Sequence, residues 1–307
     1  MLEQQQSSSR SSASYLGRNE NLKTTGNPSS ENSETAEYPQ IQFVFKNQDV
    51  IVIDKPFDLH IDGDHLFTVE KLVNHQYPEM ANPPNPIVER RGFIQSKRKL
   101  KFCHQLDYAT SGILCLAFTR QTCAAISQCF QQRTAKKYYL AVVRGHMKEN
   151  TFQVKSWIAE DPLDANNFRM RNYFKGEDKT PLNDLSTLNE QERKQAEESK
   201  ESTTEGQALK RGYYCIDGDR KNRIEVTKIL LKPRTGRRHQ LRLHTQLLGH
   251  PILGDGAYGI GVEGEEGMHR MMLHAWCLSL PGVMDNELKT RDPFEADGHY
   301  FEWIEDC

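Results

Sequence analysis

Short apolar runs separated by polar turns recur along the chain, and they predict a set of β-strands. Residues 41–45 and 50–54 lie on either side of the polar turn 46–49, a pattern typical of two adjacent strands. The run at 113–118 is apolar throughout, which predicts a strand buried on both faces. Further strands are predicted at 138–143 and 227–232.

Polar and apolar spacing also predicts helices, at 68–77, 120–133 and 238–248. Thr68, at the start of the first range, and Thr119, just before the second, are predicted N-terminal caps, and Gly249 follows the third range as a stop. Because strands and helices mix without a regular strand–helix–strand rhythm, the expected fold class is α+β.

Two stretches are too polar to form a core of their own. Residues 1–37 contain seven apolar residues, none of them Val, Ile, Phe or Trp, so we expect residues 1–40 to be disordered. Residues 185–212 contain six Glu and five Lys or Arg, and we expect an exposed helix or a disordered charged insertion there. Residues 41–307 are predicted to form one folded domain that carries this insertion.

The composition excludes several classes of protein. No apolar run exceeds six residues, whereas a membrane-spanning helix needs about 18 or more. The first 30 residues lack the apolar centre of a secretory signal. The formal net charge is -2, from 40 Lys and Arg against 42 Asp and Glu, which excludes a uniformly basic nucleic-acid binder but not a local basic patch.

The cysteines and the first residues bear on the compartment. No C-x-x-C pair occurs among the seven cysteines, which disfavours a zinc ribbon. Without an export signal we expect reduced thiols in a cytosolic or nuclear protein. A mitochondrial location is disfavoured because residues 1–37 contain five Glu, and transit peptides avoid acids.

One candidate site is the polar stretch 104–112, which runs straight into the buried strand at 113–118. Small residues beside Asp107 predict a tight turn that presents its carboxylate. The alternative is a polar turn in which Asp107 caps its own backbone.

A second candidate site is the stretch 232–242, with five cations and no acid. A glycine turn opens the helix here, so backbone N–H groups add to the positive field. Arg238 and Arg242 are four residues apart and are predicted to share a helix face. The alternative is an ordinary solvated basic helix.

The chain resembles the RluA-type RNA pseudouridine synthases at five places that follow the order of that family. The stretch 104–112 (HQLDYATSG) is similar to their HRLDxxTSG signature, and 236–244 (GRRHQLRLH) is similar to GRxHQIRxH. The remaining three are KYYLA at 137–141, GHPILGD at 249–255 followed by YG at 258–259, and LHA at 273–275. Together they cover the chain from about Ile41 to Leu280.

This resemblance implies a fold, a reaction and a set of site residues. It implies a pseudouridine synthase fold, with a mixed, mostly antiparallel sheet flanked by helices, and isomerisation of uridine to pseudouridine in a structured RNA. Because this isomerisation involves no redox change, we expect it to need no cofactor and no metal, and we expect the protein to act as a stand-alone monomer. Asp107 corresponds to the catalytic carboxylate, Tyr139 to the ring that packs on the target base, and Arg242 to the cation that pairs with the aspartate. The expected RNA contacts are His104, Gln105, Lys137, Arg237, Arg238, His239 and Gln240.

The chain departs from the family pattern at two positions. Gln105 stands where Arg is usual, and an amide supplies neither charge nor a guanidinium plane for flipping the base. Asp58 stands where the NKPxGL motif has glycine, so that loop must differ in shape. The N-terminal segment is too polar to fold as a separate S4-type RNA-binding domain, so we expect RNA to be held by the catalytic domain itself, through the basic segment 90–101 together with Arg234, Arg237 and Arg238.

Three other functions compete with this interpretation. The strongest is an RNA-binding protein that keeps the synthase fold without its activity. A serine hydrolase built on Ser111 is disfavoured because the G-x-S-x-G elbow is missing. A zinc site formed by His60, His65 and His75 is disfavoured because these residues lack a tight ligand spacing.

Overall fold

The computed structural model describes residues 39–78, 100–174, 189–259, 268–295 and 300–304 of the 307-residue chain. The predicted disorder of residues 1–40 and the basic segment 90–101 fall almost entirely outside these ranges, so both stay predictions. In the described part of the chain, no helix is long and apolar enough to cross a membrane.

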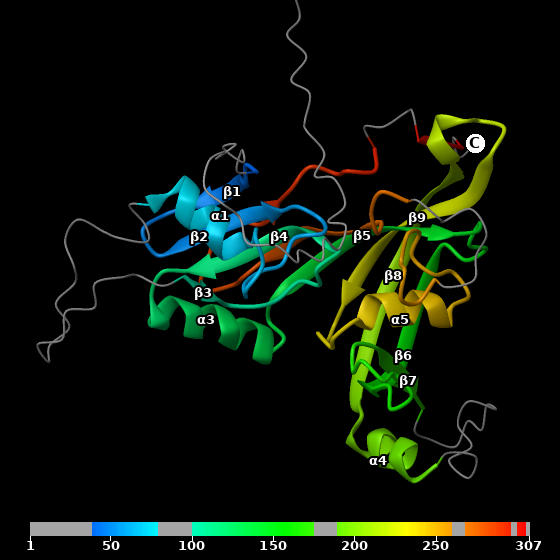
Figure 1. Cartoon of the computed structure of the whole chain (residues 1–307), viewed down its shortest axis with the longest axis horizontal. Helices are drawn as coiled ribbons and strands as arrows, with labels where there is room; N and C mark the ends of the chain where they lie inside the picture. The colour runs from blue at the N-terminus through cyan, green and yellow to red at the C-terminus, as the bar shows by residue number, and fades with distance from the viewer. Residues whose placement is uncertain (1–38, 79–99, 175–188, 260–267, 296–299, 305–307) are drawn as a thin grey trace, which may run out of the picture. The chain divides into compact units, whose positions relative to one another are not determined.

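A mixed sheet of twelve strands organises the described residues (Figure 1). Its main path runs β1 (Gln42–Lys46), β2 (Val50–Lys55), β4 (Ser111–Ala117), β10 (Leu273–Ser279), β5 (Lys136–Arg144), β9 (Arg223–Pro233), β8 (Lys200–Cys215), β6 (Thr151–Glu160) and β7 (Met170–Tyr173). Three short strands, β3 (Lys101–Phe102), β11 (Leu288–Lys289) and β12 (Phe301–Trp303), pair with β4, β10 and β8. Strands β4 and β10 are parallel, and the other pairs are antiparallel. The sheet is therefore mixed and mostly antiparallel, as predicted.

The helices begin where the sequence supplies capping residues. Helices α1 (Val69–Gln76) and α3 (Arg120–Gln131) are capped by Thr68 and Thr119, whose side chains accept the N–H groups of Lys71 and Thr122. Helix α4 spans Glu190–Glu198, and α5 spans Gln240–Leu247. The predicted start of α5 at residue 238 is wrong, because His239 adopts a left-handed conformation with φ 56°. Arg238 therefore lies outside the helix and shares no helix face with Arg242.

Strands β2 and β4 are buried on both faces, which explains their continuous apolar sequences. Ile51, Ile53, Leu114 and Leu116 pack with α1 on one face. Alternate residues of the same strands, including Val52 and Cys115, pack with Ile126 of α3 on the other face. Figure 1 shows α1 and α3 on opposite sides of these strands.

Residues 200–212 correct the expectation of an exposed helix or a disordered insertion at 185–212. Within 189–212, the described part of this stretch, only α4 is helical, and the residues that follow it form β8, which pairs with β9 on one side and β6 on the other. In the first part of β8 the inward positions are polar or small: Ser202 and Thr204 are fully buried, and Gly206 lies against the ring of Phe152. This first part of β8 is buried without large apolar side chains, so its sequence resembles that of a solvated segment.

Candidate active site

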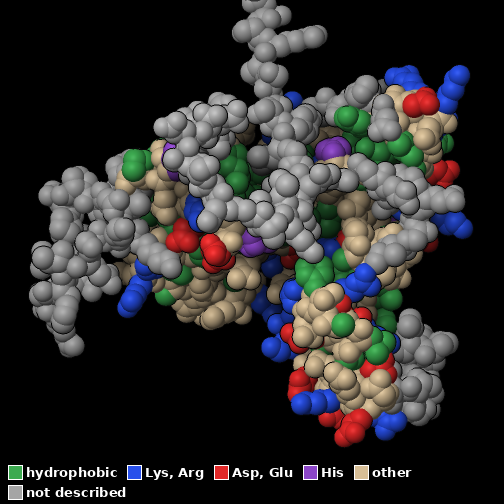
Figure 2. Space-filling view, in the orientation of Figure 1, with side chains coloured by type: hydrophobic (Ala, Val, Ile, Leu, Met, Phe, Trp, Pro, Cys, Tyr) green, Lys and Arg blue, Asp and Glu red, His purple; other side chains and the backbone are tan. Residues whose placement is uncertain are grey.

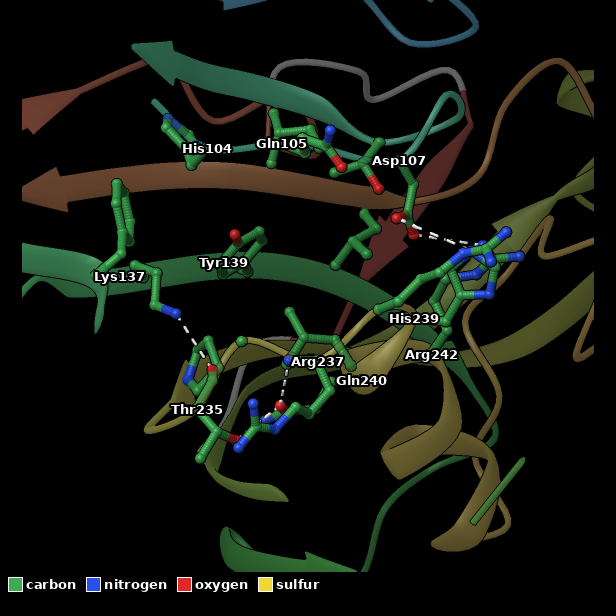
Figure 3. A pocket seen from close by; sticks show the side chains of 18 of the residues that line it. His104, Gln105, Asp107, Lys137, Tyr139, Thr235, Arg237, His239, Gln240 and Arg242 are labelled. Carbon is green, nitrogen blue, oxygen red and sulfur yellow. Dashed lines mark hydrogen bonds and ion pairs between the residues drawn. The ribbon is translucent and has the colours of Figure 1, made fainter. Parts of the chain in front are cut away.

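An open cleft of about 1230 Å³ lies where three segments far apart in the sequence meet (Figure 3). They are the loop before β4, the beginning of β5, and the turn that joins β9 to α5. They meet because β10 pairs with both β4 and β5, and β5 pairs with β9. All ten residues singled out from the sequence line this cleft: His104, Gln105, Asp107, Lys137, Tyr139, Arg237, Arg238, His239, Gln240 and Arg242.

The backbone of the Asp107 loop is held from below by a buried lysine. The ammonium of Lys55 has no exposed surface and donates to the carbonyls of Pro56, Leu59 and Tyr108, each at 2.9 Å. Asp107 itself closes a turn, since its carbonyl accepts the N–H of Thr110 at 3.1 Å. Burial lowers the pKa of Lys55 to about 7, although Asp58 and Asp107 raise it. The resulting turn directs the Asp107 side chain into the cleft.

A glycine fixes the end of this loop against the neighbouring strand. Gly112 has φ +110°, and a Cβ atom there would lie 2.3 Å from the carbonyl oxygen of Ala275 on β10. Only glycine fits this backbone conformation and this close approach of two parallel strands. The polar stretch and its glycine therefore form a built turn.

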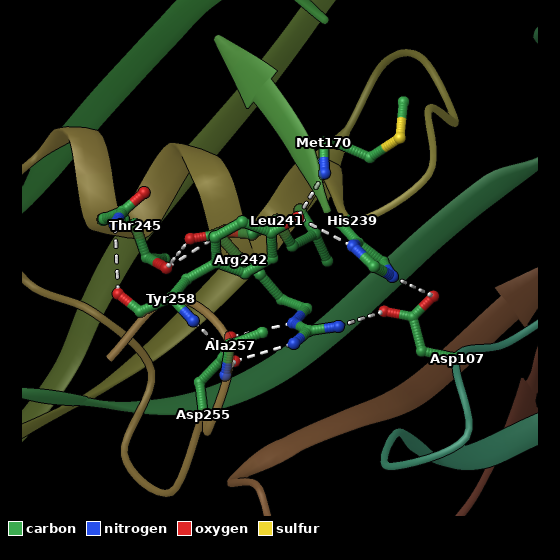
Figure 4. Close-up of polar contacts among 10 residues, drawn as sticks. Asp107, Met170, His239, Leu241, Arg242, Thr245, Asp255, Ala257 and Tyr258 are labelled. Atoms are coloured by element: carbon green, nitrogen blue, oxygen red, sulfur yellow. Dashed lines mark hydrogen bonds and ion pairs between the residues drawn. The ribbon is translucent and has the colours of Figure 1, made fainter. Parts of the chain in front are cut away.

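The carboxylate of Asp107 lies between a guanidinium and an imidazole. Nη1 of Arg242 is 3.3 Å from Oδ2, and Nε2 of His239 is 4.0 Å from Oδ1. The Asp107 side chain keeps 26% of its surface exposed, whereas the Arg242 side chain keeps 6%. The carboxylate is thus open to a molecule in the cleft while its cation is buried behind it (Figure 4).

Arg242 is held by a second carboxylate that the sequence reasoning did not assign. Its Nε and Nη2 donate to Oδ2 and Oδ1 of Asp255 at 2.8 and 2.7 Å, a bidentate pair whose acid is 1% exposed. Oδ1 of Asp255 also accepts the backbone N–H groups of Ala257 and Tyr258. Two nitrogens of the guanidinium therefore bind Asp255, and the third, Nη1, contacts Asp107.

His239 is oriented by Tyr258, which the sequence reasoning also missed. The phenol oxygen of Tyr258 accepts the N–H of Met170 at 2.8 Å and lies 2.8 Å from Nδ1 of His239. The tautomer that satisfies both neighbours of the imidazole accepts the phenol hydrogen at Nδ1 and carries its own proton on Nε2, facing Asp107. Burial lowers the pKa of His239 to about 4, so the ring is neutral near pH 7.

Tyr139 rather than Tyr138 faces the cleft. Successive residues of β5 point to opposite sides, as the alternation of a strand predicts. The ring of Tyr139 lines the cleft, while Tyr138 lies near the ammonium of Lys232, 5.9 Å from its ring centre. Burial and the charge of Asp107 raise the pKa of Tyr139, which keeps the phenol neutral.

Gln240 and His104 serve as supports of the cleft wall. Oε1 of Gln240 accepts from the Thr235 hydroxyl and the Arg237 N–H, and Nε2 donates to the carbonyl of Thr203 and the hydroxyl of Thr204. All four hydrogen-bonding positions of this amide are thus used within the chain. Nε2 of His104 accepts the N–H of Cys115 at 2.9 Å, and burial lowers the His104 pKa to about 4.

Cationic side chains line the rest of the cleft and differ in whether an acidic residue pairs with them. The exposed Arg234 forms a fork with Glu205, with both nitrogen–oxygen distances at 2.9 Å. The Arg237 and Arg238 side chains donate to the backbone carbonyls of Glu201 and Asn167, which leaves both positive charges without an acidic partner in these bonds. Figure 2 shows Lys and Arg side chains gathered near the middle of the visible face. Burial lowers the pKa of Lys137, whose ammonium donates to the Thr235 carbonyl, to about 8.

The other candidate chemistries find no site in the described residues. Ser111 is buried, bonded to Nδ1 of His274 at 2.7 Å and to the guanidinium of Arg270, and it does not line the cleft. The rings of His60 and His65 are stacked at 3.6 Å. Within the described ranges, no group of three or more His, Cys, Asp or Glu residues is arranged to hold a metal ion.

Comparisons with known proteins identify the family of this chain. A family model for RNA pseudouridylate synthase matches residues 49–247. The RNA pseudouridylate synthase domain-containing protein 1 of Mus musculus is 35% identical over 265 residues, which are 85% of this chain and 75% of the relative. The chain belongs to the RNA pseudouridylate synthase family. The resemblance found in the sequence is thereby confirmed, together with its placement among isomerases.

Two further relatives of this synthase family confirm the fold and the RluA-type resemblance. The solved structure of human RNA pseudouridylate synthase domain-containing 1 superposes with a TM-score of 0.67 at 29% identity, and covers 89% of this chain and 94% of its own. The dual-specificity RNA pseudouridine synthase RluA of Vibrio vulnificus is 28% identical over 247 residues, 78% of each chain.

The residues that the sequence did not predict are those that hold the cleft residues in place without lining the cleft themselves. Asp255 and Tyr258 lie in a stretch already compared with the family, yet nothing in their spacing says that they reach Arg242 and His239. Lys55 was likewise seen only as part of a motif. A buried lysine or aspartate has no distinctive sequence pattern, so its partner becomes visible only in three dimensions.

Proposed function

We propose that this chain isomerises uridine to pseudouridine in a structured RNA, and that Asp107 is its catalytic carboxylate. One observation supports the proposal above the others. Among the described residues, Asp107 places a partly exposed carboxylate in an open cleft, between the buried guanidinium of Arg242 and the imidazole of His239, with the ring of Tyr139 on the adjoining wall.

The isomerisation of uridine to pseudouridine requires an ionised carboxylate. The N1–C1′ glycosidic bond breaks, a C5–C1′ bond forms, the hydrogen of C5 is lost and N1 gains one, so the base is isomerised without net oxidation or reduction. A carboxylate serves the first step either by attacking the sugar carbon or by accepting a proton from the ribose. Both routes need the ionised form, and the guanidinium 3.3 Å away stabilises that negative charge.

The target uridine must leave its stack to reach Asp107, at a cost of a few kcal/mol. The ring of Tyr139 lines the cleft and offsets part of this cost, since stacking contributes about 1–3 kcal/mol per base. We assign Gln105, Lys137, Arg237 and Arg238 to contacts with the RNA, because each lines the cleft and none of their side chains is ion-paired in the bonds described above. His104 and Gln240 are assigned to positioning these residues.

The test is a pseudouridine map of cellular RNA incubated with the recombinant chain. Asp107→Asn removes the charge and keeps the shape, so we expect conversion to disappear while RNA binding is retained. Asp285→Asn is the matched control, because Asp285 is exposed and does not line the cleft. Identical maps for the wild type, Asp107→Asn and untreated RNA would favour an RNA-binding protein without synthase activity.

A further inference from the structure

The loop between β6 and β7 carries an aromatic ring at the edge of the cleft. This loop is built by Asp164, whose carboxylate accepts the backbone N–H groups of Asn166, Phe168 and Arg169. Asn167 completes the turn in a left-handed conformation with φ 53°. These bonds lower the pKa of Asp164. The loop is thus held in one conformation from within, and this conformation fixes where Phe168 lies.

Phe168 lines the cleft with 48% of its surface exposed. One side of the ring lies against His239, with ring centres 5.1 Å apart and planes tilted by 56°. The guanidinium of Arg238 lies 5.6 Å from the ring centre and donates to the carbonyl of Asn167. His239 in turn faces Asp107, so the exposed ring is two contacts away from the carboxylate.

This combination of groups fits a nucleotide. An exposed aromatic ring stacks on bases of any identity, and an adjacent arginine neutralises the phosphate that links the stacked base to its neighbour. Gln105, on the loop of Asp107, has neither a ring nor a charge for this purpose. Leu163 on the same loop as Phe168 is 66% exposed but does not line the cleft, so exposure alone does not distinguish Phe168.

We propose that Phe168 is an RNA-binding residue that stacks on the base next to the target uridine, while Arg238 contacts the phosphate beside that base. The inference rests on the proposed function, since it takes the uridine to be held at Asp107. It adds a second stacking position to the cleft, separate from Tyr139. The ring and the guanidinium together form a subsite for the flanking nucleotide.

Binding measurements test this subsite without requiring turnover. The probe is a fluorescent RNA hairpin with an all-uridine loop, together with the same hairpin lacking one loop base. Phe168→Leu keeps an apolar group over His239 but removes the aromatic face, and we expect it to weaken binding about tenfold. Phe168→Trp restores the affinity, and Leu163→Ala, the matched control on the same loop, leaves it unchanged.

A double-mutant cycle separates stacking from packing. If the ring stacks on the missing base, the base deletion weakens wild-type binding about tenfold but has little further effect on Phe168→Leu. Equal losses from the base deletion at every loop position in both proteins would show that the ring only packs on His239. Wild type that binds the hairpin but forms no pseudouridine would contradict the proposed function and leave the stacking result standing. Wild type that does not bind the hairpin would overturn both.

Discussion

Replacing Asp255 by asparagine tests whether the buried fork holds the cation of the cleft. The introduced amide would keep one oxygen for Arg242 but would turn an NH₂ group toward a guanidinium N–H, so one hydrogen bond and the negative charge are lost together. Removing one partner of a buried ion pair destabilises a protein by about 3–5 kcal/mol. Because the Asp255 and Arg242 side chains are 1% and 6% exposed, we expect Asp255→Asn to lower the free energy of unfolding by about 3 kcal/mol.

Urea unfolding followed by tryptophan fluorescence measures this loss, and the chain supplies its own control. Arg234 and Glu205 form the same fork, with both distances at 2.9 Å, but their side chains are 65% and 33% exposed. Glu205→Gln should therefore cost about 0–1 kcal/mol. Equal losses for the two variants would refute the reasoning that burial decides the strength of the fork.

The Asp255 variant also has a functional consequence under the proposed mechanism. A guanidinium freed from its fork no longer holds Nη1 in place 3.3 Å from the Asp107 carboxylate. Misplacement of a catalytic group by about 1 Å lowers rates by on the order of a hundredfold. We expect pseudouridine formation to fall by that factor in the folded variant, while the Glu205 variant keeps its rate.

Three further results are expected. Gly112→Ala should prevent stable folding, because the new Cβ would lie 2.3 Å from the carbonyl oxygen of Ala275. Gly282 also has a positive φ, +78°, but open space around it, so Gly282→Ala should lower the melting temperature only modestly. Equal changes in melting temperature would refute the argument that the close approach of the strands requires glycine. The free energy of unfolding should fall as the pH is lowered from about 6.5 to 4. Burial lowers the pKa of His244 to about 4, so in this pH range the His244 side chain takes up a proton only in the unfolded chain. In chemical denaturation series at several pH values, His244→Gln should therefore make the free energy of unfolding depend less steeply on pH. RNA affinity measured by fluorescence anisotropy should fall steeply with salt, and Arg237→Gln should reduce the log–log slope by about one; a flat wild-type response would remove the basic wall as an RNA surface.

The sequence predicted those parts of the fold in which side-chain type and burial agree. The apolar run at 113–118 became the strand β4, and Thr119 became the cap of α3. The same reasoning failed for β8, because its inward residues Ser202 and Thr204 bond to the buried imidazole of His244 instead of packing on apolar neighbours. A polar pair that satisfies itself inside the protein has the same sequence pattern as a solvated segment.

The candidate site was predicted to a similar extent. Asp107, Tyr139 and Arg242, which the motifs singled out, line one cleft. The supports of these residues were not predicted, since Asp255 and Tyr258 act through contacts that only the folded chain creates. The start of α5 at Gln240 was likewise not predicted, because it depends on the left-handed conformation of His239.

The fork between Arg242 and Asp255 means that the cleft is assembled before any ligand arrives. A guanidinium without a fixed carboxylate partner would have to be ordered when the ligand binds, and the entropy cost of that ordering would reduce the affinity. Here two of its nitrogens are already fixed in the free protein, and only the edge facing Asp107 remains. Under the proposed function, binding free energy that is not spent on ordering Arg242 would be available for the transition state.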